Sequence, residues 1–109
     1  MPIAKQDLNI EQLRSSAGDA CGLLKVLANQ DRLLLLCQMT QGEYCVSELE
    51  EMCGIRQPTL SQQLTVLRDE AMVSTRREGK QIYYTIASRE AMAVMQVLYE
   101  LYCGAGKAK

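Results

Sequence analysis

Apolar residues recur every three or four positions over much of the chain, which is the spacing of helices that bury one side. On this basis a first helix is predicted to begin near Leu13 and to end at Asn29. Its apolar stripe consists of Leu13, Ala17, Ala20, Cys21, Leu24, Leu27 and Ala28. A second helix has Asp31 in its first turn and runs to about Thr40. Because this helix is apolar nearly all round, it is expected to be buried.

The following segment has the pattern of two short helices joined by a tight connection. The stretch "TQGEYC" is predicted to be a turn around Gly42, and Ser47 is expected to begin a short helix that Gly54 stops. Pro58 suits the first position of the next helix, in which leucines at positions 60, 64 and 67 form a buried stripe. Two helices joined in this way predict a helix-turn-helix.

After residue 72 the pattern changes to the alternation that is typical of strands. Two strands are predicted to meet at "EGK", where Gly79 suits the positive φ of a hairpin turn. Ser88 is expected to cap a last helix, and residues 104–109 are expected to be a frayed tail. The order α-α-α-α-β-β-α predicts a mainly α, winged helix-turn-helix fold with a β-hairpin wing, as one domain over residues 1–109.

The first and last helices carry broader apolar faces than one small core needs. These faces could simply cover the helix-turn-helix. The interpretation that we favour is that they also form a twofold interface, so that the protein is a homodimer through its first and last helices.

Charge and composition limit the classes of function that the chain can have. The chain has a net charge of −1, but residues 55–84 carry five basic and three acidic residues, whereas the remainder carries seven basic and ten acidic ones. This asymmetry is typical of a surface that faces a polyanion. The chain has no histidine and no glycine-rich phosphate loop, so we expect no enzyme activity, no cofactor and no metal. Without a signal peptide or a membrane-spanning run, it is expected to be cytoplasmic and not membrane-bound.

A polar, nearly uncharged face is predicted opposite the leucine stripe of the Pro58 helix. Glutamine can pair with adenine in the major groove, and serine or threonine can contact bases or phosphates. Basic residues on the hairpin can bind phosphates or enter a minor groove. The sequence therefore predicts an interface for double-stranded operator DNA, whose residues are Gln57, Thr59, Ser61, Gln62, Gln63, Thr65, Arg68, Arg76, Arg77 and Lys80.

Three segments carry a family resemblance over nearly the whole chain. They are "KVLANQDRLLLL", "VSELEEMCGIRQPTLSQQLTVLRDEAMVSTRREGKQIYYTI" and a last helix that closes on "YELYC". These segments resemble the ArsR family of dimeric winged-helix repressors. The resemblance implies binding to promoter DNA and derepression when a sensor site is occupied.

Within that family, Cys37 and Cys103 match the cysteine pair of the sulfide- and persulfide-responsive branch, the BigR and SqrR type. The match implies that a persulfide or related reactive sulfur species is the inducer. It also implies that a di- or polysulfide cross-link between the two cysteines releases operator DNA.

Metal sensing is the main alternative, because many members of the family respond to metals. The Cys-x-Cys pair that metalloid sensors often carry is replaced here by Cys45-Val46-Ser47. Thiolates of Cys45 and Cys53, or of Cys37 and Cys103, could still bind a soft metal or arsenite, and a general oxidant response is also open. Cys21, Cys45 and Cys53 are expected to fill core or surface. Sequence identifies no cation near Cys37 that would lower its pKa.

Overall fold

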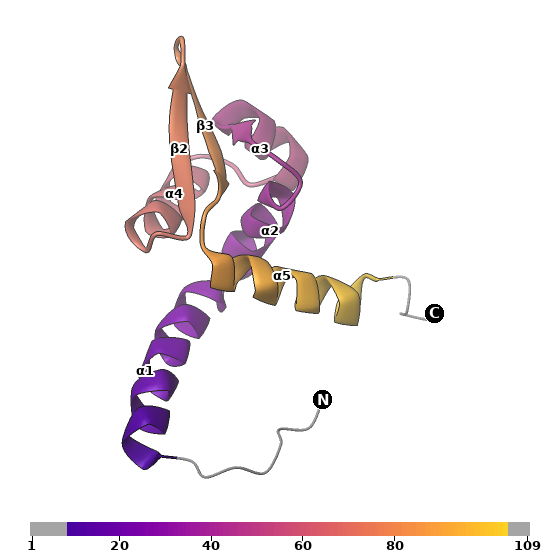
Figure 1. Ribbon diagram of the computed structural model, residues 1–109. Coiled ribbons are helices and arrows are strands. Elements are labelled where there is room, and N and C mark those ends of the chain that lie inside the picture. The colour runs from indigo at the N-terminus through magenta and orange to yellow at the C-terminus, as the bar shows by residue number, and fades with distance from the viewer. Residues whose placement is uncertain (1–8, 105–109) are drawn as a thin grey trace.

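The computed structural model describes residues 9–104 and has the predicted order of helices with one additional strand. The elements are α1 (Ile10–Leu27), α2 (Gln30–Met39), β1 (Tyr44–Cys45), α3 (Val46–Cys53), α4 (Thr59–Asp69), β2 (Val73–Glu78), β3 (Gln81–Ile86) and α5 (Arg89–Tyr102). The β2–β3 hairpin projects from one end of the molecule, and α1 and α5 extend away from the centre in different directions (Figure 1). The fold is a winged helix-turn-helix. Of the predicted tail, only Gly104 lies within the described residues.

Local signals in the sequence account for the ends of the elements. The side-chain oxygen of Asn29 accepts a 3.0 Å hydrogen bond from the Arg32 amide and begins α2, and Ser88 caps α5 in the same way. Gly54 ends α3 at a φ of +70°, and Gly79 turns the hairpin at +63°. The predictions for Ser88, Gly54 and Gly79 are confirmed, whereas Asn29 begins α2 instead of ending the first helix, which stops at Leu27. The predicted starts of α3 and α4 are each displaced by one residue, because α3 begins at Val46 and α4 at Thr59.

The prediction of a plain turn over "TQGEYC" is wrong in its second half. Tyr44 and Cys45 form β1, which pairs antiparallel with β3 opposite Tyr84 and Tyr83. The sheet order is therefore β1-β3-β2, and the hairpin is joined to the segment before α3. A strand of two residues is too short to give an alternating pattern, and only its pairing with β3 defines it.

The core lies between α2, α3, α4 and the start of α5. Its fully buried large side chains are Leu35, Leu36, Met39, Leu49, Leu60, Leu67 and Met95. The predicted stripe of α4 is confirmed, since Leu60, Leu64 and Leu67 are all buried. No helix within residues 9–104 is long and apolar enough to cross a membrane.

The prediction that α2 is buried all round is wrong on one side. Leu34 is 44% exposed, so one side of α2 faces outward instead of being enclosed. Along α1 only Val26 and Leu27 are buried, and the earlier part of the predicted stripe is exposed. The reason is visible in Figure 1, where only the last turn of α1 reaches the core and its earlier turns project away from the centre of the molecule.

Candidate DNA interface and thiol site

The leucine stripe of α4 fixes which of its side chains face outward. Because the three leucines are buried against the core, the opposite side presents Ser61, Gln62 and Thr65 to solvent, with Arg68 one turn further on. Thr59 is half-buried at the start of the helix. This outward side is polar, as the sequence predicted, and its charges are Arg68 and Asp69 at the end of the helix. Such a surface has the donors and acceptors that read base edges.

Two glutamines at the edge of this surface are held by bonds within the protein. The Gln57 side-chain oxygen accepts a 3.1 Å hydrogen bond from the Ser61 amide and so caps the start of α4. The Gln63 side-chain oxygen accepts a 2.8 Å bond from the guanidinium of Arg32. Gln57 and Gln63 therefore position the helix, whereas the side chain of Gln62 makes no hydrogen bond within residues 9–104.

Arg32 is a residue that sequence reasoning missed. Its Nε donates a 2.6 Å hydrogen bond to the Val26 carbonyl in the last turn of α1, while its NH1 group bonds Gln63 on α4. One half-buried side chain therefore ties together α1, α2 and the outward-facing helix. The only signal in the sequence is a charged residue at the start of an apolar run, and that signal does not identify its partners.

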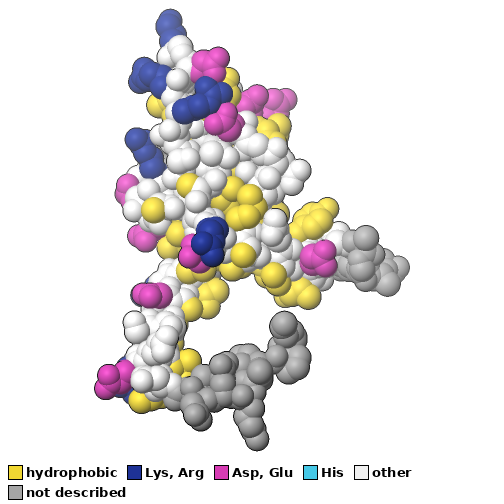
Figure 2. Space-filling model, in the orientation of Figure 1, with side chains coloured by type: hydrophobic (Ala, Val, Ile, Leu, Met, Phe, Trp, Pro, Cys, Tyr) yellow, Lys and Arg dark blue, Asp and Glu magenta, His cyan; other side chains and the backbone are white. Residues whose placement is uncertain are grey.

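The basic residues of the hairpin fall into two groups. Arg76 bonds Glu43 at 2.8 Å and Glu78 at 2.6 Å, and its guanidinium lies 5.0 Å from the centre of the Tyr83 ring. Arg77 and Lys80 are exposed and make no ion pair within the described part of the chain. Figure 2 shows Lys and Arg side chains gathered along the hairpin. Arg77 and Lys80 are therefore available to bind phosphate. Arg76 instead joins β2 to the segment before β1 through its bond to Glu43.

Cys37 and Cys103 come from the two elements that the sequence predicted. Cys37 is half-buried near the end of α2, and Cys103 is exposed at the end of α5. Burial raises the pKa of the Cys37 thiol above its ordinary value, and the charge of Cys103 raises this pKa further. The two thiols therefore lie near enough for the charge of one to act on the other. Within residues 9–104 no cation lowers the pKa of Cys37, whose resolved causes both raise it.

The other three cysteines have different surroundings. Cys21 is exposed on α1. Cys45 is buried in β1, with its sulfur 3.4 Å from the Ser47 hydroxyl. Cys53 is half-buried at the end of α3, and burial together with the charge of Cys37 raises its pKa. Within residues 9–104 no three His, Cys, Asp or Glu side chains are grouped closely enough to hold a metal ion.

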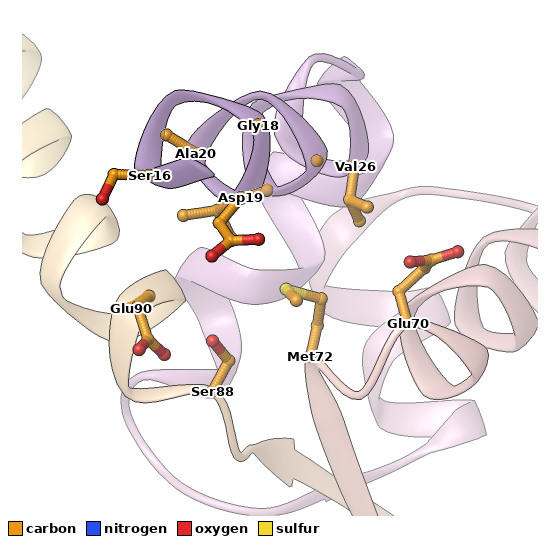
Figure 3. Close-up of a pocket in the computed structure, with 11 residues that line it drawn as sticks. Ser16, Gly18, Asp19, Ala20, Val26, Glu70, Met72, Ser88 and Glu90 are labelled. Carbon is orange, nitrogen blue, oxygen red and sulfur yellow. The ribbon is translucent and has the colours of Figure 1, made fainter. Parts of the chain in front are cut away.

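A cavity of about 850 Å³ lies between α1, the end of α4 and the start of α5. Its lining includes Asp19, Glu70 and Glu90 together with Met72 and Ser88, and no cysteine or basic residue (Figure 3). Repulsion from its carboxylates makes it unsuited to DNA phosphate, and it is separate from the thiol site.

Comparison with known proteins defines the class. The model of the bacterial regulatory protein, arsR family, matches residues 29–75, which run from the cap of α2 into β2. The biofilm growth-associated repressor of Agrobacterium fabrum is 44% identical over 102 residues, covering 94% of this chain and 87% of the relative. The chain belongs to the ArsR family.

The relatives also define the branch. The crystal structure of the transcriptional repressor BigR from Xylella fastidiosa superimposes with a TM-score of 0.81 at 43% identity, covering 88% of this chain and 98% of that one. The transcriptional activator HlyU of Vibrio cholerae is 36% identical and covers 98% of this chain and 100% of its own. The chain is a BigR-type member of the family.

Proposed function

We propose that this protein is a transcriptional repressor that binds operator DNA as a homodimer and releases it when persulfide modifies Cys37 and Cys103. The observation that carries the DNA-binding part is the exposed polar side of α4, together with Arg77 and Lys80 of the hairpin, which make no ion pair within residues 9–104. In winged-helix proteins of this kind the second helix of the motif enters the major groove. The repressor function follows the names of the BigR relatives.

The homodimer is supported by the apolar side chains that one chain leaves uncovered. Ile10 and Leu24 on α1, and Val97, Tyr99 and Leu101 on α5, are each more than half exposed. Hydrophobic side chains lie along α5 and along the side of α1 that faces it (Figure 2). A twofold interface built from these helices would place two copies of α4 in successive major grooves, about 10 base pairs apart.

The sensor chemistry begins with the thiolate of Cys37. It attacks the sulfane sulfur of an organic persulfide, RSSH, forms a persulfide on Cys37 and expels RS⁻. The Cys103 thiolate then attacks Sγ of Cys37 and expels HS⁻, which leaves a disulfide. If both cysteines carry persulfides, attack of one terminal sulfur on the other Sγ gives a trisulfide and again expels HS⁻. The electrostatic interaction between the two thiols supports this pairing.

Release of DNA follows from where the cross-link lies. α2 belongs to the helix-turn-helix core, whereas α5 carries part of the proposed dimer interface. A covalent bond between their ends constrains the angle between core and interface and therefore the separation of the two α4 helices. A tenfold loss of operator affinity requires only about 1.4 kcal/mol.

The experiment compares operator binding before and after treatment with glutathione persulfide, peroxide, diamide, arsenite or Cu(I). We expect the wild type to release DNA with persulfide, and Cys37→Ser and Cys103→Ser to stay bound. Cys21→Ser and Cys45→Ser are matched controls that should still release. Mass spectrometry should find peptides of Cys37 and Cys103 joined. Release by arsenite or Cu(I) alone, or a normal response of either sensor variant, would overturn the proposal.

A further inference from the structure

Cys53 lies directly beside the helix that carries Cys37. Its sulfur is 4.0 Å from the Leu34 carbonyl oxygen on α2. Leu34 precedes Cys37 by three residues, and residues three apart are neighbours on one side of a helix. The end of α3 therefore brings a second thiol to the side of α2 on which Cys37 lies.

Cys37 and Cys53 also share a cavity. It has a volume of about 570 Å³ and lies between α2, α3 and α5. Both cysteines line it, and Cys103 does not. The rest of the lining consists of uncharged side chains, chiefly methionines and glutamines such as Met52, Met92 and Gln96. A persulfide formed on Cys37 would thus be next to Cys53 in a space large enough for the added sulfur.

Electrostatic interactions also indicate that Cys53 and Cys103 are the thiols that interact with Cys37. The charge of Cys103 raises the pKa of Cys37, and the charge of Cys37 raises the pKa of Cys53. Cys37 therefore has a candidate partner on each side, one on α3 and one at the end of α5. The lining of this cavity contains no basic residue, so no positive charge in it stabilises the thiolate of Cys37 or of Cys53 over the other.

We propose that Cys53 is a second modification site, which competes with Cys103 for the persulfide formed on Cys37; the inference rests on the proposed function. The Cys53 thiolate attacks Sγ of the Cys37 persulfide, forms a Cys37–Cys53 disulfide and expels HS⁻. The oxidising equivalent is the sulfane sulfur of the RSSH donor, and this sulfur leaves as HS⁻. No other oxidant is required.

The two cross-links have different consequences. The Cys37–Cys53 bond joins α2 to α3, two helices of the same core that already pack together. It leaves α5 free, so the protein remains on its operator. Cys53 thereby diverts part of the modified protein into a DNA-bound form and lowers the fraction of protein that a given donor concentration releases.

The first test is Cys103→Ser treated with glutathione persulfide, with Cys103→Ser/Cys53→Ser as the matched control. Cleavage after basic residues alone leaves residues 33–56, with three cysteines, on one peptide; additional cleavage after glutamate separates residues 33–43 from 52–56. We expect these two peptides to be joined in Cys103→Ser, with DNA still bound, and only a persulfide on Cys37 in the control. If Cys53 of Cys103→Ser stays free to alkylation, the inference is wrong.

The second test is a donor titration of operator release by the wild type and Cys53→Ser. At a given donor concentration Cys53→Ser should release up to about twice as much DNA as the wild type, the change expected when one of two competing thiols of similar reactivity is removed. Cys45→Ser should match the wild type. Superimposable curves for Cys53→Ser and wild type would overturn the competition. A wild type that never joins Cys37 to Cys103 would instead overturn the proposed function, whatever Cys53 does.

Discussion

The guanidinium of Arg32 donates a 2.8 Å hydrogen bond to the side-chain oxygen of Gln63, across 31 positions of sequence. The bond joins the first turn of α2 to the helix that we place in the major groove. A second bond from Arg32 reaches the Val26 carbonyl at the end of α1. The orientation of the DNA-reading helix is therefore linked, through one side chain, to a helix whose exposed apolar residues belong to the proposed dimer interface.

Gln63→Ala tests this link. The substitution leaves the half-buried Arg32 without one of its partners, and we expect the free energy of unfolding to fall by about 1–3 kcal/mol. Operator affinity should fall to a similar extent for all sequences, because the helix is mispositioned and no base contact is lost. Urea denaturation and binding to operator and scrambled DNA measure the two effects. Unchanged stability would mean that the bond contributes nothing in solution.

Gln62→Ala should behave in the opposite way. The Gln62 side chain is exposed and has no hydrogen-bond partner within residues 9–104, so its loss should change stability by less than about 0.5 kcal/mol. If Gln62 pairs with a base in a bidentate manner, the variant should lose about 1–3 kcal/mol of binding at one base step. Binding to a set of singly substituted operators measures this loss. Full retention of affinity and specificity would show that another side of α4 faces the bases.

The hairpin arginines give a second matched pair. Arg77 has no ion pair in the described chain, whereas Arg76 is bonded to Glu43 and Glu78. Arg77→Ala should weaken binding to all DNA sequences and reduce the slope of log affinity against log salt by about 1. Arg76→Ala should leave that slope nearly unchanged. An equal reduction for both variants would show that Arg76 exchanges its carboxylates for phosphate.

These contrasts mark what the sequence could and could not predict. Helical periodicity and the signals of Ser88 and Gly79 are local, so the order of the helices and of the hairpin and the outward side of α4 were predicted correctly. The partners of Gln63 and Arg76 come from distant positions, and no local pattern encodes them. The same holds for β1, which exists only through its pairing with β3.

At the thiol site, too, some residues were predicted from the sequence and others are evident only in the folded chain. The family resemblance pointed to Cys37 and Cys103, and the electrostatic interaction between them agrees with that pairing. Cys53 was expected to be filler, because its neighbour on α2 lies 16 positions earlier and a folded chain is needed to bring α3 against α2. Likewise, the pKa of Cys37 depends on burial and on a distant thiol, neither of which a sequence pattern reports.

The raised pKa of Cys37 predicts the pH dependence of its reaction with persulfide. The thiolate is the nucleophile, and both burial and the charge of Cys103 disfavour it. The rate of modification should therefore rise by about tenfold per pH unit from neutral pH upward, without reaching a plateau near pH 8. Initial rates at a series of pH values, followed by mass spectrometry of residues 33–43, measure this profile.

Cys103→Ser supplies the control for the same measurement. Removing the neighbouring thiol removes one of the two causes that raise the pKa of Cys37, so the profile should shift toward lower pH while burial still keeps it above the ordinary range. Cys21→Ser, which changes an exposed thiol on α1, should leave the profile in place. A plateau below pH 8 in the wild type would mean that a positive charge, and not burial, governs the reactivity of Cys37.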